Sequence, residues 1–110
     1  MNTKINRTQP IRGLTEGAPS QNPKRRSDLN CRIIDGETVI LDLKEGHLHQ
    51  LNPTASFIWD CCDGNLRMDQ IVDRLASAYE VDSTRARKDV EEVVAKLQSS
   101  NLLEADWNER

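Results

Sequence analysis

The residues with the most chemical potential in this sequence are two histidines and two adjacent cysteines. His47 and His49 are two positions apart, so on a β-strand their side chains share one face. Two imidazoles could begin a metal site, but no third ligand lies close to them in the sequence. The spacing therefore favours exposed or groove-lining histidines on an edge strand, and we predict no metal site.

Cys61 and Cys62 fall late in an expected helix, where neighbouring residues point about 100° apart. One should be buried and the other partly buried. A nucleophile or a redox pair would need a nearby histidine or cation to lower a thiol pKa, and the sequence places none there. The chain also has no P-loop, GxGxxG or HExxH motif. We therefore predict a protein that is not an enzyme and has no cofactor.

The length of 110 residues corresponds to one domain, yet the apolar content is only 36%. The deficit lies in the first 28 residues, where three of the four prolines also occur. Their apolar residues are Met1, Ile5, Ile11, Leu14 and Ala18. We predict a flexible basic N-terminal arm over residues 1–28, a folded domain over 29–104 and a C-terminal tail over 105–110.

Charge is divided unevenly along the chain. Residues 1–34 hold seven basic and two acidic residues, a net charge of +5; because the whole chain carries -3, the remainder carries -8. Lys24-Arg25-Arg26 is the basic end of the arm, and we interpret it as a solvated linker. An acidic body does not favour a nucleic-acid partner, which needs a basic folded surface.

The sequence lacks the segments that would direct the protein into a membrane or out of the cell. No apolar run approaches the length of a membrane span, and the N-terminus has no apolar secretion segment. The three cysteines have no disulfide-like or metal-like spacing. We expect a cytoplasmic protein that does not contact membranes.

Period-two alternation predicts three short strands. Leu29, Cys31 and Ile33 alternate with polar residues, as in a half-buried strand. Asp35-Gly36 then favours a tight hairpin turn. The second strand covers residues 38–43, and the third covers 47–51 after a turn at 44–46. The second strand has one apolar face, made of Val39, Leu41 and Leu43. The result is an antiparallel meander with two open edges.

Helical periodicity begins at Asn52-Pro53, a good N-cap followed by a residue suited to the first turn. The first helix ends at Asp63-Gly64, a second runs over about 68–79, and Asp82-Ser83 caps a third that ends near Asn101. Leu102 and Leu103 should pack back on the core. The apolar stripe of the third helix is Ala86, Val90, Val93, Val94 and Leu97. The sequence thus predicts an α+β fold of three strands followed by three helices.

From about Leu29 to Leu103 the chain resembles the PqqD family, small proteins of pyrroloquinoline quinone biosynthesis and related peptide-maturation pathways. The resemblance rests on the run from His47 to Ala55, on Ile58-Trp59 and on Cys62-Asp63-Gly64. It continues through Ile71–Leu75, Tyr79, Asp89-Val90, Leu97 and Leu102-Leu103. One departure is that Arg67 and Gln70 stand where the family has a capping Ser or Thr and a Glu, so the second helix is expected to fray or start later.

The resemblance implies a winged helix-turn-helix-like fold without catalytic activity. Family members bind the leader of a precursor peptide and present it to a radical SAM or other modifying enzyme. The leader adds a strand to the third strand and lies in a groove against the third helix. The peptide-binding residues that we predict on the third strand are His47, Leu48, His49, Gln50 and Leu51. Those on the third helix are Val90, Val94 and Leu97 nearest the groove, with Arg85 and Arg87 as partners for acidic leader residues.

Two other functions remain open from the sequence. The fold would also suit a winged-helix DNA-binding regulator, although carboxylates on the second and third helices argue against it. Open sheet edges would also suit a structural adaptor or a strand-exchanged dimer, so the protein is expected to be a monomer or a homodimer. For the leader-binding function, a proline at His49 should abolish binding if that N–H points outward.

Overall fold

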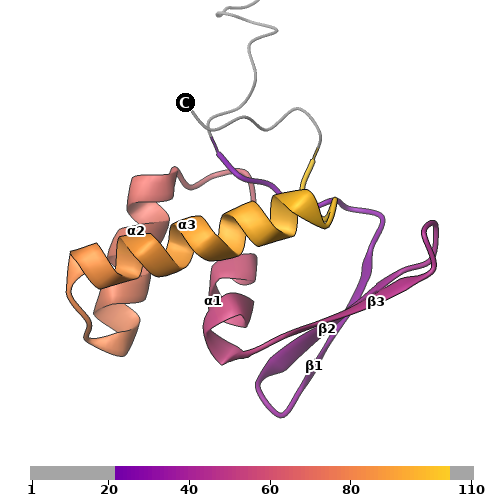
Figure 1. Ribbon diagram of the computed structural model, residues 1–110, viewed down its shortest axis with the longest axis horizontal. Coiled ribbons are helices and arrows are strands. Elements are labelled where there is room, and N and C mark those ends of the chain that lie inside the picture. Colours follow the sequence, from indigo (N-terminus) through magenta and orange to yellow (C-terminus); the bar gives the residue numbers. More distant parts are fainter. Residues whose placement is uncertain (1–21, 105–110) are drawn as a thin grey trace, which may run out of the picture.

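The computed structural model describes residues 22–104, which form three strands followed by three helices (Figure 1). The elements are β1 (Asn30–Ile34), β2 (Glu37–Asp42), β3 (His47–Leu51), α1 (Pro53–Cys61), α2 (Met68–Tyr79) and α3 (Ser83–Ser99). The sheet is antiparallel with the order β1-β2-β3. The predicted α+β order is confirmed. Residues 1–21 of the predicted arm and the predicted tail 105–110 lie outside the described residues.

Local capping sets where each helix begins. The Asn52 side chain accepts the N–H of Ala55 at 2.8 Å, with Pro53 in the first turn. Asp82 caps α3 in the same way. The expectation that α2 would fray is wrong: Gln70 accepts the N–H of Arg67 at 2.8 Å, and the helix begins at Met68. An amide therefore replaces the carboxylate of the usual capping pair.

The core lies between the three helices and one face of the sheet. In Figure 1, α3 lies across α1 and beside α2, while the sheet extends to one side. The buried apolar residues are Ile40, Ala55, Ile58, Trp59, Cys61, Cys62, Ile71, Val72, Leu75, Ala86, Val90, Val94, Leu97, Leu102 and Leu103. Leu102 and Leu103 therefore pack back on the core as predicted. Only β2 among the strands supplies a fully buried apolar residue, Ile40.

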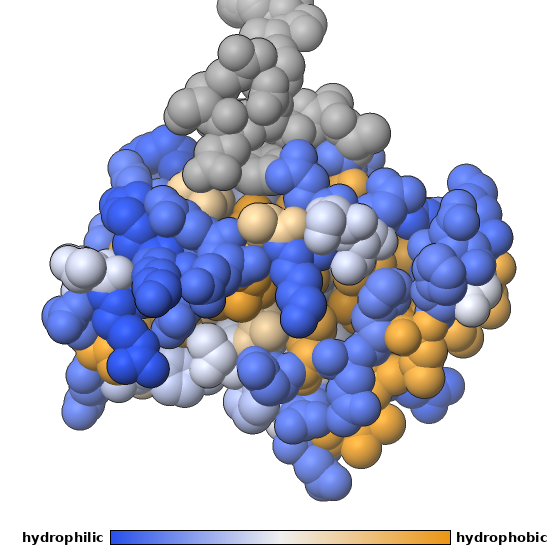
Figure 2. Space-filling model, viewed as in Figure 1, coloured by the Kyte–Doolittle hydropathy of each residue, from blue (hydrophilic) through white to orange (hydrophobic). Residues whose placement is uncertain are grey.

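The burial of the strands differs from the sequence-based expectation. All five residues of β1 are exposed, so the half-buried first strand is wrong. Val39 and Leu41 do share a face, but it is the one turned away from the helices, where Leu41 is 36% exposed. The opposite face of β2 presents Thr38, Ile40 and Asp42 to the helices. Figure 2 accordingly shows apolar surface gathered over the sheet, while the exposed side of α3 is hydrophilic.

Residues 22–28, hereafter the strap, pass along the ends of α1 and α3. The N–H of Arg25 donates to the carbonyl of Cys62 at 2.8 Å, and the N–H of Arg26 donates to that of Leu102 at 3.1 Å. The interpretation of residues 24–26 as a solvated linker is therefore wrong. Their partners lie far away in the sequence, so composition alone could not indicate them. The domain boundary after residue 28 stays a prediction.

Candidate functional site

The outer edge of β3 offers backbone groups that no neighbouring strand uses. Asp35 and Gly36 both have positive φ, 52° and 82°, which makes a two-residue hairpin turn between Ile34 and Glu37. Such a turn makes its flanking residues a hydrogen-bonded pair, and the direction of the backbone groups then alternates along each strand. The backbone N–H and C=O groups of Thr38, Ile40 and Asp42 consequently point toward β3, while their side chains point toward the helices.

The same alternation decides which residues of β3 point outward. Thr38, Ile40 and Asp42 are opposite Leu51, His49 and His47, so the backbone N–H and C=O groups of those three β3 residues point toward β2. Leu48 and Gln50 then direct their N–H and C=O groups to the open edge. The N–H of His49 points inward, so a proline at that position would disturb the sheet itself. The outward position suited to a proline test is Gln50.

Ser56 joins the sheet to α1 at the inner end of β3. Its hydroxyl accepts the N–H of Thr38 at 2.8 Å and donates to the carbonyl of Leu51 at 3.1 Å. The hydroxyl thus bridges two strands at the point where the chain leaves the sheet for the helix. Together with the Asn52 cap, this contact fixes the direction of α1 relative to β3.

A groove separates β3 from the C-terminal half of α3. Within the described residues, α3 packs against α1 and α2 but makes no backbone contact with the sheet. The resulting cavity has a volume of about 380 Å³. Its apolar lining is Leu48, Leu51, Ala55, Val93, Leu97 and Leu102, and its polar lining is His49, Gln50, Asn52, Lys96 and Ser100.

The groove contains no carboxylate side chain among its lining residues. Lys96 is exposed there and forms no ion pair with any described residue. This absence of negative charge contrasts with the acidic character of residues 35–110. A side chain that entered the groove would therefore meet an apolar surface with one cation beside it.

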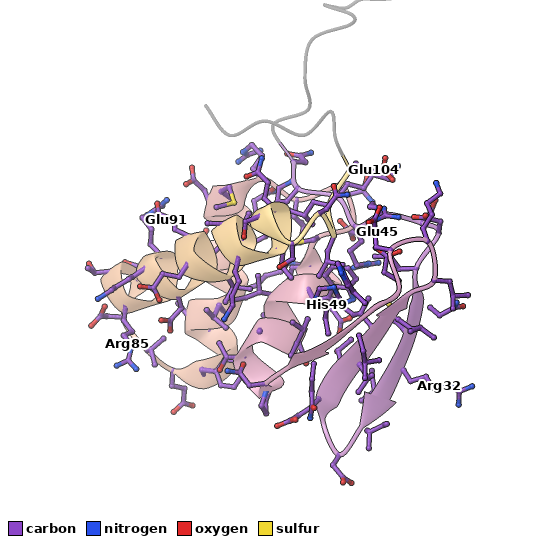
Figure 3. All side chains as sticks on the ribbon, turned by 45° about the vertical axis from the view of Figure 1, so that its right-hand side comes forward. Arg32, Glu45, His49, Arg85, Glu91 and Glu104 are labelled. Atoms are coloured by element: carbon purple, nitrogen blue, oxygen red, sulfur yellow. The ribbon has the colours of Figure 1, made fainter. Side chains whose placement is uncertain are left out.

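His49 lies between the groove and a neighbouring hollow that also contains His47 and Glu45. Figure 3 shows His49 on β3 beside the C-terminal part of α3, with Arg85 at the opposite end of that helix. The two imidazoles meet edge to face with ring centroids 6.0 Å apart. The described residues hold no group of three potential metal ligands. The Nε2 atom of His49 is buried and has no hydrogen-bond partner among the described residues.

The structure brings some of the predicted site residues to this groove and not others. Leu48, His49, Gln50, Leu51 and Leu97 line it, and His47 lies in the adjoining hollow. The remaining four predicted residues on α3 are placed elsewhere.

Val90 and Val94 are 0% and 1% exposed and belong to the core, so the choice of these two valines needs correction. Arg85 lies near Asp89 at the other end of α3, and Arg87 pairs with Asp69 of α2. Neither arginine lines the groove. The correction has a geometric reason: the core and the groove take different sides of one helix, and both sides carry valines.

Three groove residues on or directly after α3 were not predicted from the sequence: Val93 as a groove residue, Lys96, and Ser100, the C-cap residue of the helix. With Leu97 they have the spacing of one helical face, since residues three, four and seven apart lie above one another. A helical projection starting at Val93 would have found this face. The apolar stripe drew attention to Val90 and Val94 instead.

Cys61 and Cys62 do not form a reactive site. Burial raises the pKa of the Cys62 thiol to about 12, and burial also raises the pKa of Cys61. Both residues are therefore thiols near neutral pH, whereas a nucleophile needs the thiolate. The Cys62 thiol donates to the carbonyl of Ile58 at 3.2 Å, so its contacts are those of a core residue.

Comparison with known proteins places this chain in a family. The model of the family described as "Coenzyme PQQ synthesis protein D (PqqD)" matches residues 37–103, more than half of the chain. The chain belongs to this family. No curated protein matches the chain.

Three solved structures are similar to this member of the PqqD family. TbiB1 in complex with the TbiA(beta) leader peptide has a TM-score of 0.67 and 29% identity, covering 74% of this chain and 95% of its own. Lasso peptide synthetase B1 complexed with the leader peptide has a TM-score of 0.64, 28% identity and the same coverage.

The third structure is an NMR structure of the PqqD truncation of PqqCD from Methylobacterium extorquens, a stand-alone recognition element for ribosomally made, modified peptides. Its TM-score is 0.64 at 22% identity, and the match covers 82% of this chain and 96% of that one. At this identity the likeness shows the shared fold.

Within residues 22–104, no helix combines the length and apolar character needed to cross a membrane.

Proposed function

We propose that this protein binds the leader of a ribosomally made precursor peptide and presents it to a modifying enzyme, such as a radical SAM enzyme. The observation that carries the proposal is the open edge of β3 beside an apolar groove. The structures of TbiB1 and lasso peptide synthetase B1 with leader peptides support it, because both share the fold of this chain. We propose the cytoplasm, where such precursors are made, as the place of action.

The peptide would bind as an additional strand next to β3. Leu48 and Gln50 would each donate one backbone hydrogen bond and accept another, which gives affinity with little demand on peptide sequence. Selectivity would come from the groove, because every second peptide side chain would turn toward α3. Burying one such apolar side chain contributes about 1.5–3 kcal/mol.

Charge narrows the class of peptide further. Lys96 is the cation at the groove, and no lining residue carries a carboxylate. We therefore expect a leader with an Asp or Glu side chain close to the apolar residue that enters the groove. This role replaces the one that the sequence assigned to Arg85 and Arg87.

The protein itself would act by binding rather than by catalysis. The Cys61 and Cys62 thiols stay protonated near neutral pH, and the described residues hold no cluster of metal ligands. No observation favours DNA binding: Asp73, Glu91 and Glu92 are exposed on α2 and α3 and would repel phosphates. The homodimer hypothesis stays a prediction.

The test uses a fluorescein-labelled peptide selected from a displayed random library against the full 110-residue chain. Hydrogen exchange followed by NMR should show that the bound peptide slows exchange of the Leu48 and Gln50 amides, because both would gain a partner. Protection confined to β1, or selected peptides that leave both amides unprotected, would contradict strand addition at β3. Selection of no binding peptide would contradict the proposed function as a whole.

A further inference from the structure

The strap closes one end of the molecule by contacts with segments that are far apart in sequence. The backbone of Lys24 forms an isolated antiparallel β-bridge with that of Asp63, and the backbone of Arg25 forms one with that of Leu103. The N–H of Glu104 donates to the carbonyl of Lys24 at 2.7 Å, so the chain after α3 is held on the strap's other side. The strap thus lies between the end of α1 and the end of α3.

Gly64 shows how closely the strap is seated. Its N–H donates to the carbonyl of Pro23 at 3.1 Å, and its φ of +86° favours glycine. A Cβ atom at this position would lie 3.1 Å from the Cδ atom of Lys24. Pro23 itself is buried. These contacts fix the backbone of the strap around Lys24. Arg26, two residues further along, therefore has a defined position.

Arg26 connects the β2–β3 hairpin to the end of α3. One guanidinium nitrogen, Nη1, donates to Asp42 Oδ2 at 3.0 Å and to the carbonyl of Asn101 at 2.8 Å. The other two nitrogens donate to Asp28 of the strap. The Arg26 and Asp42 side chains are only 13% and 3% exposed, so this is not an ordinary surface ion pair.

Asp42 also forms hydrogen bonds with the turn that precedes β3. Its Oδ1 atom accepts the N–H groups of Lys44 and Glu45 at 3.1 and 3.2 Å, and its carbonyl accepts the N–H of Gly46 at 2.8 Å. The residue after Gly46 is His47, the first of β3. Arg26 is therefore linked to the strand that forms one wall of the groove and to the segment that follows the other wall.

We propose that Arg26 is a positioning residue for the peptide groove, holding β3 at a set separation from α3. Among the described residues, α3 and the sheet make no backbone contact with each other. The Asp42–Arg26–Asn101 connection, hereafter the clamp, joins the end of β2, the neighbour of β3, to the second residue after the end of α3. This inference rests on the proposed function for its consequence, but the clamp itself is testable without a peptide. The strap lies outside residues 37–103 that match the family.

The expected consequence for binding follows from preorganisation. If the walls separate without the clamp, only a fraction of the molecules has a groove of the right width. The apparent dissociation constant then rises by the reciprocal of that fraction. A fall of that fraction to about one tenth would weaken peptide binding about tenfold. Arg26 would produce this effect without touching the peptide.

The first experiment measures amide exchange of the full chain without any peptide. Arg26→Ala should speed exchange of the His47 and His49 amides, which face β2, relative to those of Ile71 and Leu75 in α2. A merely destabilising change speeds exchange of all globally protected amides together. Because Arg26→Ala leaves Asp42 buried without its cation, Arg26→Gln combined with Asp42→Asn provides a second variant with no unpaired charge. It should show the same selective change.

Two controls separate the clamp from its neighbours. Asp28→Asn removes the negative charge that pairs with Arg26 within the strap but leaves the Asp42 and Asn101 contacts, so β3 exchange should stay as in the wild type. Ile71→Val destabilises the core at a buried residue that does not line the groove, and it should speed exchange without selectivity for β3. Arg26→Lys, which keeps one charged donor, should restore part of the β3 protection.

Binding of the library-selected peptide is then measured by fluorescence polarisation. The inference predicts a loss of about tenfold for Arg26→Ala and no more than a small loss for Ile71→Val. Unchanged β3 exchange in both Arg26 variants would overturn the clamp even if the peptide binds the wild type. Equal losses of affinity in Arg26→Ala and Ile71→Val would also overturn it, since general stability would then explain both. If no peptide binds the wild type, the exchange result still decides the clamp.

Discussion

The two open edges of the sheet are alike in their backbone and different in their surroundings. β1 and β3 are both outer strands, and in each of them every second residue directs unused N–H and C=O groups outward. Beside β3 stands the apolar groove against α3, whereas all five residues of β1 are exposed. An unpaired strand edge supplies backbone hydrogen bonds to any extended peptide. Selectivity among peptides also requires side chains beside the edge that contact the peptide side chains.

Prolines on the two edges should give the largest difference. Gln50→Pro removes an outward N–H of β3, and its ring would meet the incoming strand. We expect peptide affinity to fall about a hundredfold, the equivalent of about 2.7 kcal/mol. Ile33→Pro makes the same change on the outward side of β1 and should leave affinity unchanged. Fluorescence polarisation measures both, and Gln50→Ala controls for loss of the side-chain contact with Glu37. Equal effects of the two prolines would remove the distinction between the edges.

Shortening an apolar side chain tests the wall of the groove. Val93→Ala deletes two methyl groups from the lining and should weaken peptide binding about tenfold, because each buried carbon contributes about 0.8 kcal/mol. Val39→Ala deletes the same atoms on the face of β2 turned away from the helices and should not change affinity. Isothermal titration calorimetry with both variants provides the comparison. A larger loss for Val39→Ala would place the peptide on the open face of the sheet instead.

Reversing one charge tests the preference for acidic peptides. Lys96→Glu should weaken binding of a peptide containing Asp or Glu about three- to fivefold, as expected for an exposed ion pair of about 1 kcal/mol. The loss should shrink at high salt. Lys88→Glu makes the same change on α3 away from the groove and serves as the control. If a peptide with the acidic residue replaced by Lys binds Lys96→Glu no better than it binds the wild type, Lys96 has no part in selection.

Acid should act on the β3 side of the sheet through Asp42. Burial alone would raise the pKa of this carboxyl, but the N–H groups of Glu45 and Lys44 and the Arg26 guanidinium together lower it below its ordinary value. A carboxyl whose pKa is lower in the folded chain than in the unfolded chain stabilises the folded protein fully at pH values above the pKa of the unfolded chain. This stabilisation is lost as the pH falls through the pKa of the folded state.

The measurement is the free energy of unfolding in urea as a function of pH. Stability contributed by Asp42 should be constant near neutral pH and decline below about pH 4, where a carboxyl begins to protonate in the unfolded chain. Asp42→Asn should be less stable at pH 7 and should show a shallower decline in acid. A pH profile of Asp42→Asn parallel to that of the wild type would show that this carboxylate is not responsible.

Much of the fold was predictable because its signals are local. Asp35-Gly36 supplies the positive φ angles of a tight turn, and Asn52-Pro53 supplies both the cap and the first turn of α1. Each signal involves residues next to each other, so no knowledge of the tertiary structure is needed to interpret it. The order of strands and helices, and the open edge at residues 47–51, follow from such signals.

The composition of the groove needed the tertiary structure. Periodicity shows that a helix has an apolar face, but not which neighbour covers each part of it. Val90 and Val94 therefore could not be distinguished from Val93 before the packing of α3 on α1 and α2 was known. In β2, alternation marks the face of Val39 and Leu41 as the more apolar one, yet the helices cover the opposite face, which carries Thr38, Ile40 and Asp42.

The sequence by itself determined the element order, the turns, the caps and the edge strand, because each depends on the conformational preferences of a few consecutive residues. Only the tertiary structure decided which side of α3 lines the groove and that the strap contacts the ends of α1 and α3. Arg26, Asp42 and Asn101 are distant in sequence and polar in type, so nothing in their local context indicates that they meet. Contacts of this kind depend on how the elements pack, and the width of the groove depends on them.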